Sequence, residues 1–415
     1  MTRILIFSDS RWRDSFGHAL VKYHLQSLLP DSEVQVISFN ICIPIIELFK
    51  PDVVVLNHLN GKRNKQLASF VKRHDGYVVI MPPEGRPNTE KQLDWFVEQG
   101  NHSYCDLLLS WNDIVANRVK NAIVTGCPRF DIHQPPYNQS IQSRELFCAR
   151  YNIDNSQPII AFCSSFPQSK YHYKNKAFNR IDLKDLKVTT IAGFDNPDEL
   201  AEREYQNLLT FQHWIRSVRY EYSDTYNYVI KPHPMEDITL WQRFCNENGI
   251  LLIDGDYIFN VCNAAELVVS RAECLTHQDA WLCNKPSIHC MIGSGKGEGA
   301  GAEALQYGGR GIASSVSGLL GKIVEVETSP PSIEYLNKYG YTVPDSALKC
   351  AQAIANLVKN HKSNEIPYEN RIELNRLLSK FDAENNNPTM DGLGHFGKTV
   401  TRKIVNDWIE KIRAI

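Results

Sequence analysis

The sequence lacks the marks of a membrane-spanning, disulfide-bonded or nucleic-acid-binding protein. Its 415 residues carry a net charge of −2, so there is no global basic field to attract nucleic acid. Eleven cysteines are scattered without any C-x-x-C pair, which argues against a disulfide framework and a structural zinc site. The most apolar stretch, ISFNICIPIIELF, is too short and too polar to span a bilayer. We therefore expect a cytoplasmic protein with reduced thiols, at most attached to the inner face of a membrane.

Short apolar runs alternate with longer helical segments along the whole chain. Continuous Val, Ile and Leu runs such as DVVVLNH and ELVVS are typical of parallel strands covered on both faces. The pattern breaks at the polar link NIDNSQP and then starts again. We predict an α/β protein of two Rossmann-like, doubly wound domains that face a central cleft, with domains at residues 1–152 and 157–385.

The C-terminal stretch 397–415 has the pattern of an amphipathic helix. Its apolar residues fall on one helical face: Val400, Ile404, Val405, Trp408, Ile409 and Ile412. We expect this face to pack on the N-terminal domain, so that the helix returns to it. Docking on a membrane surface is the alternative, because basic residues occupy much of the other face.

In open α/β sheets, ligands bind beyond the carboxyl ends of the strands. In the first half, the polar residues at these positions are Asp9, Arg11, Arg13 and Asp14 after the first strand, His58 after DVVVLNH, and Glu84 after GYVVIM. In the second half they are Ser164, Ser165, Lys231, His233, Ser270, Arg271 and Glu273. We expect Asp9, Arg11, Arg13 and His58 on the acceptor side of a reaction, where the arginines could hold an acidic group or be surface charge.

The sequence YNYVIKPHPMED places a lysine and a histidine between prolines at a strand end. Each proline fixes its own φ and restricts the residue before it, so Lys231 and His233 stand on stiff backbone. Lysine offers a point charge and histidine a ring donor, and both suit a phosphate. The helix that follows Ser270 and Arg271 begins with unpaired backbone N–H groups, which also favour an anion. Glu273 in its first turn could accept from ribose hydroxyls or simply stabilise the helix.

The glycine-rich segment GSGKGEGAGAE, Gly293–Glu303, is not a P-loop. A P-loop needs Ser or Thr directly after the lysine to hold Mg²⁺, but Gly297 follows Lys296. We interpret this segment as a flap over the cleft, or as a passive loop, rather than a triphosphate site.

With these residues in view, the chain resembles the GT-B glycosyltransferases. More narrowly, it is similar to His-Pro-motif enzymes of bacterial surface and capsule polysaccharide biosynthesis. These include β-linked 3-deoxy-manno-octulosonic acid (Kdo) transferases of lipopolysaccharide and capsule, bacterial sialyltransferases and, more distantly, teichoic acid glycerophosphotransferases. The segments that carry the resemblance are PPEGRP, VTGCPRFDI, VIKPHP and VVSRAECLTHQDAWLCNKPSI, in family order over roughly residues 1–380.

The resemblance implies that His233 binds the donor phosphate and that Glu84 is the catalytic acid or base. The family's acidic-acidic-Gly motif reads Pro83-Glu84-Gly85 here, so its first acidic position is absent. Where the glycerophosphotransferases have a serine-rich stretch, this chain has Ser270-Arg271-Ala272-Glu273, which favours a sugar donor over a CDP-polyol. If the reaction retains configuration, a carboxylate must attack the anomeric carbon, and the candidates are Glu84, Glu236, Asp237 and Glu273.

The leading hypothesis is a glycosyltransferase that moves Kdo or another ulosonic acid from a CMP-sugar to a glycan or lipid-linked acceptor. CMP carries one phosphate, so Lys231, His233 and a helix N-terminus could stabilise its charge without a metal or another cofactor. The alternatives are a CDP-polyol phosphotransferase, a UDP-sugar-dependent transferase, and a sugar-nucleotide-binding protein without turnover.

Overall fold

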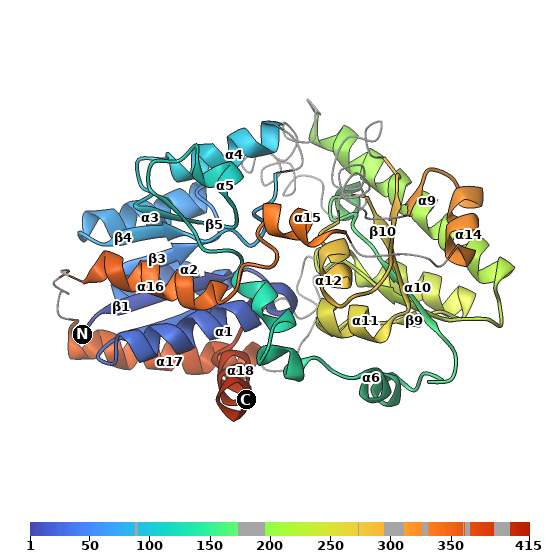
Figure 1. Cartoon of the computed structure of the whole chain (residues 1–415). Helices are drawn as coiled ribbons and strands as arrows, with labels where there is room; N and C mark the ends of the chain where they lie inside the picture. Colours follow the sequence, from blue (N-terminus) through green and yellow to red (C-terminus); the bar gives the residue numbers. More distant parts are fainter. Residues whose placement is uncertain are drawn as a thin grey trace. The chain divides into compact units, whose positions relative to one another are not determined.

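The computed structural model describes residues 1–87, 90–172, 196–272, 274–293, 311–325, 331–359, 361, 366–385 and 399–415. The chain divides into two compact units. Unit 1 comprises Met1–Ser140 with the described residues from Asn337 to the C-terminus, and unit 2 comprises the described residues of Ile141–Leu336. Each unit contains one six-stranded sheet in which neighbouring strands are parallel (Figure 1). The predicted α/β class with two Rossmann-like halves is therefore confirmed.

The sheet of unit 1 has the strand order β2-β1-β3-β4-β5-β6. Its strands are β1 (Arg3–Ser8), β2 (Glu33–Ser38), β3 (Val53–Leu56), β4 (Tyr77–Ile80), β5 (Leu107–Ser110) and β6 (Ala122–Val124). The order reverses between β1 and β3, and such a switch point is where ligands bind in open α/β sheets. Asp9 and His58 follow these two strands, so the topology places both at the switch point.

Helices cover both faces of this sheet. They are α1 (Arg11–Leu28), η1 (Phe39–Ile41), α2 (Cys42–Phe49), α3 (Lys62–Arg73), α4 (Glu90–Gly100), α5 (Asp113–Ala116), η2 (Pro128–His133), η3 (Tyr137–Ser140), α16 (Ser346–Val358), α17 (Tyr368–Asn385) and α18 (Arg402–Ala414). Leu5 and Phe7 of β1 share a core with residues of α2, α3, α4 and α17. On α1, the neighbours are α16 and α18, which lie beside it in Figure 1.

The sheet of unit 2 has the order β12-β11-β10-β7-β8-β9. Its strands are β7 (Ile159–Cys163), β8 (Asn227–Lys231), β9 (Leu251–Leu252), β10 (Leu267–Arg271), β11 (Ser287–Cys290) and β12 (Ile312–Ala313). In chain order this is the 3-2-1-4-5-6 arrangement of dinucleotide-binding folds. Its switch point lies between β7 and β10, so the residues that follow these strands are the first candidates for ligand contact.

Two separate cores cover the two faces of this second sheet. The helices of unit 2 are α6 (Arg144–Tyr151), η4 (Ser169–His172), α9 (Pro197–Glu221), α10 (Ile238–Asn248), α11 (Ile258–Ala264), α12 (Thr276–Leu282) and α14 (Val316–Val324), and α15 (Ile333–Lys338) leads from unit 2 into unit 1. Residues of α9, α10 and α14 pack on Ile160 and Phe162. Residues of α6 and α11, with Ala280 of α12, pack on Ile159 and Ala161.

The units differ from the predicted domains of residues 1–152 and 157–385. The first unit ends at Ser140 instead, because Phe147 and Cys148 of α6 are buried in the core of the second sheet. The segment from Asn337 belongs to unit 1, because α16 packs on α1 and Leu374 and Leu378 of α17 enter the first core. The polar link NIDNSQP therefore connects α6 to β7 within unit 2.

The C-terminal helix α18 packs its apolar face on unit 1, as expected. Ile404, Val405, Trp408, Ile409 and Ile412 are all buried. The Trp408 ring meets the Phe16 ring of α1 edge-on at 5.1 Å between centroids. Because the apolar face is buried, it is not the surface that the membrane-docking alternative requires.

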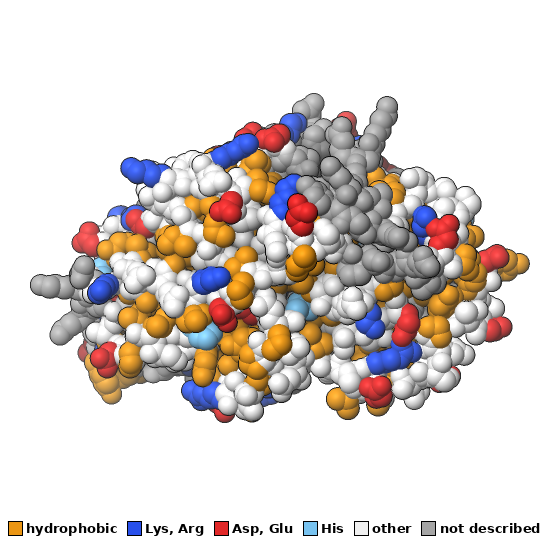
Figure 2. Space-filling model, in the orientation of Figure 1, with side chains coloured by type: hydrophobic (Ala, Val, Ile, Leu, Met, Phe, Trp, Pro, Cys, Tyr) orange, Lys and Arg blue, Asp and Glu red, His pale blue; other side chains and the backbone are white. Residues whose placement is uncertain are grey.

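Neither the net charge of −2 nor the face visible in Figure 2 points to one dominant charge. On the face shown in Figure 2, basic and acidic side chains are interspersed over the described residues. Among those residues, no helix combines the length and the hydropathy that crossing a bilayer requires. All eleven cysteines are free thiols.

Candidate functional site

In unit 1, Arg13 collects three carboxylates at the start of α1. Its Nε lies 2.6 Å from Asp14 Oδ1, its Nη1 lies 3.0 Å from Glu84 Oε1, and its Nη2 lies 3.3 Å from Asp9 Oδ2. We call Asp9, Arg13, Asp14 and Glu84 the Arg13 cluster. Burial alone would lower the pKa of Arg13, but Asp14, Glu84 and Asp9 hold it above its ordinary value.

The charge of the Arg13 cluster does not suit an acidic ligand. One positive and three negative side chains leave a net charge of −2. Asp14 is buried and also accepts from the Ser10 N–H at 3.0 Å, whereas Glu84 is 55% exposed. Exposed carboxylate oxygens accept hydrogen bonds, so the cluster is better suited to hydroxyl groups than to an acid. This disfavours the reading in which Arg13 holds an acidic acceptor.

Trp111 fixes the loop that carries Glu84. Its indole Nε1–H donates to the carbonyl of Pro82 at 2.9 Å. A Cβ on Gly85 would come within 2.3 Å of the Trp111 ring, so only glycine fits there. The loop after β4 is thus packed on a fully buried side chain, and Glu84 extends from a stiff backbone. The sequence pattern gave no indication of this role for Trp111.

The histidines of unit 1 differ in what they offer. The Asn64 amide nitrogen donates to the His58 carbonyl at 2.8 Å and lies 3.1 Å from His58 Nδ1, so Asn64 holds His58 in place. Burial lowers the pKa of His58 to about 4, although Asp9 acts in the opposite direction, so His58 is neutral near pH 7. His18, which sequence reasoning missed, has a buried Nδ1 that finds no hydrogen-bond partner among the described residues. Burial also lowers its pKa, against the effect of Asp14.

A small cavity lies beside His18. It measures about 20 Å³ and is lined by Asp14, Gly17, His18, Met81, Pro82, Pro83, Cys127, Pro128 and Arg129. This is room for about one water molecule or hydroxyl group. The i, i+4 spacing of Asp14 and His18 on α1 was the sequence signal that could have found it. Arg11, the remaining acceptor-side candidate, stacks on Trp12 at 4.4 Å from the ring centroid.

The segment Gly-Cys-Pro-Arg-Phe-Asp has a structural role in unit 1. Asp131 is buried and accepts from the backbone N–H groups of Ser346 and Ala347 at 3.1 and 2.8 Å, which caps α16. Burial raises the pKa of Asp131 to about 7, against these hydrogen bonds. Gly126 has φ of +76° and faces Ser346 and Val343 without room for a Cβ. One of the four segments behind the family resemblance therefore holds α16 to the unit.

In unit 2, Lys231 and His233 lie where β8 ends, as predicted. We call Lys231–Asp237 the His233 loop. Met235 N–H donates to His233 Nδ1 at 3.1 Å, and a backbone N–H can only donate. The neutral imidazole therefore carries its proton on Nε2, which makes Nε2–H a donor of defined direction.

Lys231 is a buried cation. Its side chain is 6% exposed, and within the described residues no hydrogen-bond or ion-pair partner of the ammonium group is present. Burial lowers the pKa of Lys231, while the Cys163 thiol, Asp256 and Asp254 raise it. A cation that is almost buried is stabilised by negative charge nearby, and an anionic ligand would add to the effect of Asp256 and Asp254.

Glu236 holds the His233 loop in place through buried hydrogen bonds. Its carboxylate is 3% exposed and accepts from Ser164 Oγ at 2.5 Å, from the Phe166 N–H, and from Trp241 Nε1 at 2.6 Å. Ser164 Oγ also accepts from the His233 N–H at 3.2 Å. Asp237 caps α10 through the Thr239 N–H at 3.0 Å. Both carboxylates have structural partners, which removes Glu236 and Asp237 from the candidate nucleophiles.

The remaining predicted residues of unit 2 are placed as follows. Arg271 forms a two-pronged ion pair with Glu204, at 2.8 and 3.0 Å, and donates to the Ser165 carbonyl at 3.4 Å. The Ser270 hydroxyl is fully buried and donates to the Cys163 carbonyl at 2.5 Å, so it serves strand packing. Glu273 and all but Gly293 of the glycine-rich segment lie outside the described residues.

Two buried histidines, which sequence reasoning missed, support the end of β10. His277 Nε2 lies 2.8 Å from the Arg271 carbonyl and His289 Nδ1 lies 3.1 Å from the Ala272 carbonyl. Their rings stack with centroids 3.6 Å apart. Carbonyl oxygens only accept, so both nitrogens carry protons, and the pair fixes the backbone beside Arg271.

The sequence contains one Asp-x-Asp pattern, Asp254-Gly255-Asp256. Two such carboxylates could hold a metal ion, so their contacts bear on whether the donor site needs one. Asp256 is 1% exposed, and its oxygens accept from the Tyr257 N–H, the Asn260 amide, the Tyr151 hydroxyl and Arg150. These contacts give Asp256 a structural role. Within the described residues, no group of three His, Cys, Asp or Glu side chains is placed to hold a metal ion.

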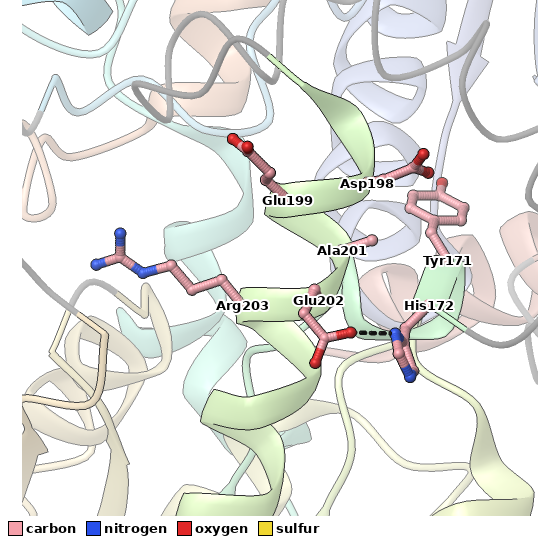
Figure 3. A pocket seen from close by; sticks show the side chains of 7 residues that line it. All are labelled: Tyr171, His172, Asp198, Glu199, Ala201, Glu202 and Arg203. Carbon is pink, nitrogen blue, oxygen red and sulfur yellow. Dashed lines mark ion pairs between the residues drawn. The ribbon is translucent and has the colours of Figure 1, made fainter.

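A larger pocket of unit 2 lies at the start of α9. It measures about 430 Å³ and is lined by Tyr171, His172, Asp198, Glu199, Ala201, Glu202 and Arg203. Figure 3 shows the ion pair between His172 and Glu202, at 2.7 Å, with Arg203 extending to the other side of the helix. Three carboxylates line this pocket against one arginine, so it suits a phosphate less well than the His233 loop does.

No protein-family model and no curated protein matches the sequence. Among solved structures, the UDP-GlcNAc 2-epimerase from Methanocaldococcus jannaschii is 13% identical, with a TM-score of 0.47 over 86% of this chain and 99% of that one. MnaA from S. aureus, solved with UDP, is 12% identical, with a TM-score of 0.49 over 88% and 99%. The wall teichoic acid polymerase TagF is 13% identical, with a TM-score of 0.49 over 91% and 90%. These identities and TM-scores below 0.5 support no conclusion about activity or site residues.

Proposed function

We propose that the chain is a glycosyltransferase of surface-polysaccharide biosynthesis, which transfers Kdo or another ulosonic acid from a CMP-sugar to a glycan or lipid-linked acceptor. The observation that carries the proposal is the pairing of buried Lys231 with the directed Nε2–H of His233 at the end of β8. One cation and one ring donor match the single phosphate of CMP better than the two phosphates of UDP or CDP.

Lys231 and His233 would act on the leaving group of the reaction, CMP. Cleavage of the bond between the anomeric carbon and the phosphate oxygen leaves negative charge on CMP. Lys231 and His233 Nε2–H would stabilise that charge as it develops, and preorganised donors of this kind contribute a large part of catalysis. We propose that this donor side needs no metal ion, which the experiment below tests directly.

Unit 1 would bind the acceptor. Glu84 is the candidate base because it is exposed and stands on the loop that Trp111 holds. Its ion pair with Arg13 at 3.0 Å positions it, and the charge of the Arg13 cluster favours an acceptor that presents neutral hydroxyl groups. Asp9 and His58, at the switch point of the first sheet, would complete this acceptor side.

The test is a thermal-shift and calorimetric titration with CMP, CDP, UDP and GDP, each with Mg²⁺ and with EDTA. A ligand that binds only the folded protein raises its stability, by about 2.7 kcal/mol at 100 times Kd. We expect a selective response to CMP that does not depend on Mg²⁺ and that is lost in His233→Ala. A preference for UDP or CDP would favour the alternative donors, and independence from His233 would overturn the proposal.

A second candidate is sugar-nucleotide binding without turnover, because the ion pair with Arg13 occupies Glu84. The two functions separate in a donor-hydrolysis assay. Glu84→Gln should abolish turnover of a CMP-sugar by a transferase and leave CMP binding intact. A protein that binds but never consumes the donor, with or without Glu84, is a binding protein. We expect either protein to work in the cytoplasm, with contact to the inner face of the membrane arising only through a lipid-linked acceptor.

A further inference from the structure

The Ser164 hydroxyl is shared between the His233 loop and a buried carboxylate. The His233 N–H donates to Ser164 Oγ at 3.2 Å, and Ser164 Oγ lies 2.5 Å from Glu236 Oε2. A hydroxyl has one hydrogen, and the ionised carboxylate can only accept. When Glu236 is ionised, the Ser164 hydrogen is therefore directed at Glu236.

Protonation of Glu236 has to reverse this hydrogen bond. The other two partners of the carboxylate, the Phe166 N–H and the Trp241 indole N–H, are donors that cannot accept a hydrogen. Only Ser164 Oγ can accept from a protonated Glu236. The Ser164 hydrogen then turns away from Glu236 and becomes available to another acceptor next to the His233 backbone.

We propose that Glu236 is a positioning residue of the phosphate site, and that anion binding at the His233 loop takes up one proton from solvent onto Glu236. In the protonated state, Ser164 gives the anion an additional hydrogen-bond donor and the buried negative charge is removed. This proposal rests on the proposed function insofar as the anion is the phosphate of the donor.

The charges around Glu236 favour this coupling. Burial raises the pKa of Glu236 to about 7, although Ser164, Phe166 and Trp241 oppose it by hydrogen bonds, so both protonation states are populated near neutral pH. Glu204 of α9 raises it further and is itself paired with Arg271 of β10. An incoming anion adds another negative charge to this set, which again favours the protonated form.

His233 and Lys231 are two further titratable groups of the loop, and each also favours an anion when protonated. The contributions of His233 and Glu236 can be separated because Glu236 is buried whereas His233 is half-buried with Nδ1 bonded to Met235. The ring nitrogens of His233 report its own protonation by NMR. Proton uptake that exceeds the change measured on His233, and that disappears in Glu236→Gln while Lys231 is still present, is then assigned to Glu236.

The experiment uses inorganic sulfate, which does not titrate between pH 6 and 9, and CMP as the second probe. Binding to the full chain is measured by calorimetry at several pH values, each in two buffers of different ionisation enthalpy. We expect proton uptake of up to one per sulfate, and affinity that falls by up to about tenfold per pH unit above neutral, since one pKa unit corresponds to a factor of ten.

The variants are Glu236→Gln, Ser164→Ala and the matched control Glu247→Gln, which makes the same change on the exposed face of α10. We expect Glu236→Gln to bind sulfate with little pH dependence above pH 7, and Glu247→Gln to behave like the unaltered protein. Ser164→Ala keeps Glu236 but removes the relayed hydrogen, so it should bind more weakly at low pH. It also serves as the readout if Glu236→Gln does not fold.

The outcomes separate the inference from the function on which it rests. If sulfate and CMP bind without proton uptake beyond that of His233, or if both variants keep the full pH dependence, the coupling is overturned while the phosphate site stands. If neither probe binds the folded protein at any pH, the phosphate site fails and the coupling fails with it.

Discussion

The two units use different means to present polar groups at the ends of their strands. Unit 1 gathers full charges, with Arg13 among three carboxylates, and leaves Glu84 half in solvent. Unit 2 buries its polar groups and relies on neutral donors around Glu236, with Lys231 as an unpaired cation among the described residues. A buried tryptophan braces each loop, Trp111 through Pro82 and Trp241 through Glu236. This contrast fits the proposed division, with hydroxyl recognition in unit 1 and anion recognition in unit 2.

The most destabilising change should be loss of Arg13. In Arg13→Met, Asp9, Asp14 and Glu84 lose their shared cation, and buried Asp14 is left uncompensated. Removing one partner of a buried ion pair costs about 3–5 kcal/mol, and because Arg13 is 20% exposed we expect about 3 kcal/mol. Urea unfolding measures it. Arg243→Met, which breaks an exposed pair on α10, is the control and should leave the stability nearly unchanged. Equal losses of stability in Arg13→Met and Arg243→Met would contradict the view that the Arg13 cluster is a buried, stabilising ion-pair network.

The next effect is on affinity rather than stability. His233→Ala removes the ring donor from the phosphate site, and a hydrogen bond to a charged group contributes about 1.5–3 kcal/mol, or roughly tenfold to a hundredfold in Kd. Calorimetry with CMP measures this loss, while thermal unfolding should change little because His233 is half-buried. His58→Ala in unit 1 should leave CMP affinity unchanged. A similar loss in both variants would show that the two units do not divide the ligands as proposed.

The two bracing tryptophans allow a matched comparison. Trp→Phe removes an indole donor from each loop at similar cost in packing. In Trp241→Phe the Glu236 carboxylate loses a hydrogen-bond donor, which we expect to lower the free energy of unfolding by about 2 kcal/mol. In Trp111→Phe the neutral Pro82 carbonyl loses its donor, which we expect to lower the free energy of unfolding by about 1 kcal/mol. Denaturant unfolding of both variants gives the ranking. The reverse order would indicate that Glu236 is not ionised in the unaltered protein at the working pH.

The last comparison concerns pH. Among the described residues, Asp131 of unit 1 and Glu236 of unit 2 are buried carboxyl groups with a raised pKa, from 3.8 to about 7 for Asp131 and from 4.5 to about 7 for Glu236. The folded protein holds these protons more tightly than the unfolded chain does. Each contribution to stability is therefore fully present below the unfolded pKa and is lost as the pH rises through about 7. We expect a loss of up to about 2.5 kcal/mol per group between pH 5 and 8, spread over these three pH units.

Unfolding curves across this range check the pH effect. Asp131→Asn and Glu236→Gln should each remove one group's contribution to the pH dependence of the free energy of unfolding. Glu247→Gln should leave that pH dependence unchanged. A slope of the opposite sign would mean that the hydrogen bonds to these carboxylates outweigh their burial.

The sequence predicted the elements well, because their signals are local. The continuous apolar runs DVVVLNH and ELVVS correctly indicated strands β3 and β10. The buried strand ends also indicated correctly that Lys231 and His233 lie at the end of β8. What the sequence could not indicate are contacts between distant segments. Asp131 caps a helix more than two hundred residues away, and Ser270 turns its hydroxyl to a neighbouring strand. Such partners depend on topology, not on spacing.

The composition of unit 1 from both ends of the chain has a consequence for its synthesis. The described residues of unit 2 lie between Ile141 and Leu336, so the ribosome makes α18 only after unit 2. A ribosome adds about 5–20 residues per second, and domains generally fold as units in the order in which they emerge. Phe16 and the rest of the α1 surface covered by Trp408 therefore stay uncovered until unit 2 and α18 have both been made. Unit 1 begins to be made before unit 2 and is completed after it.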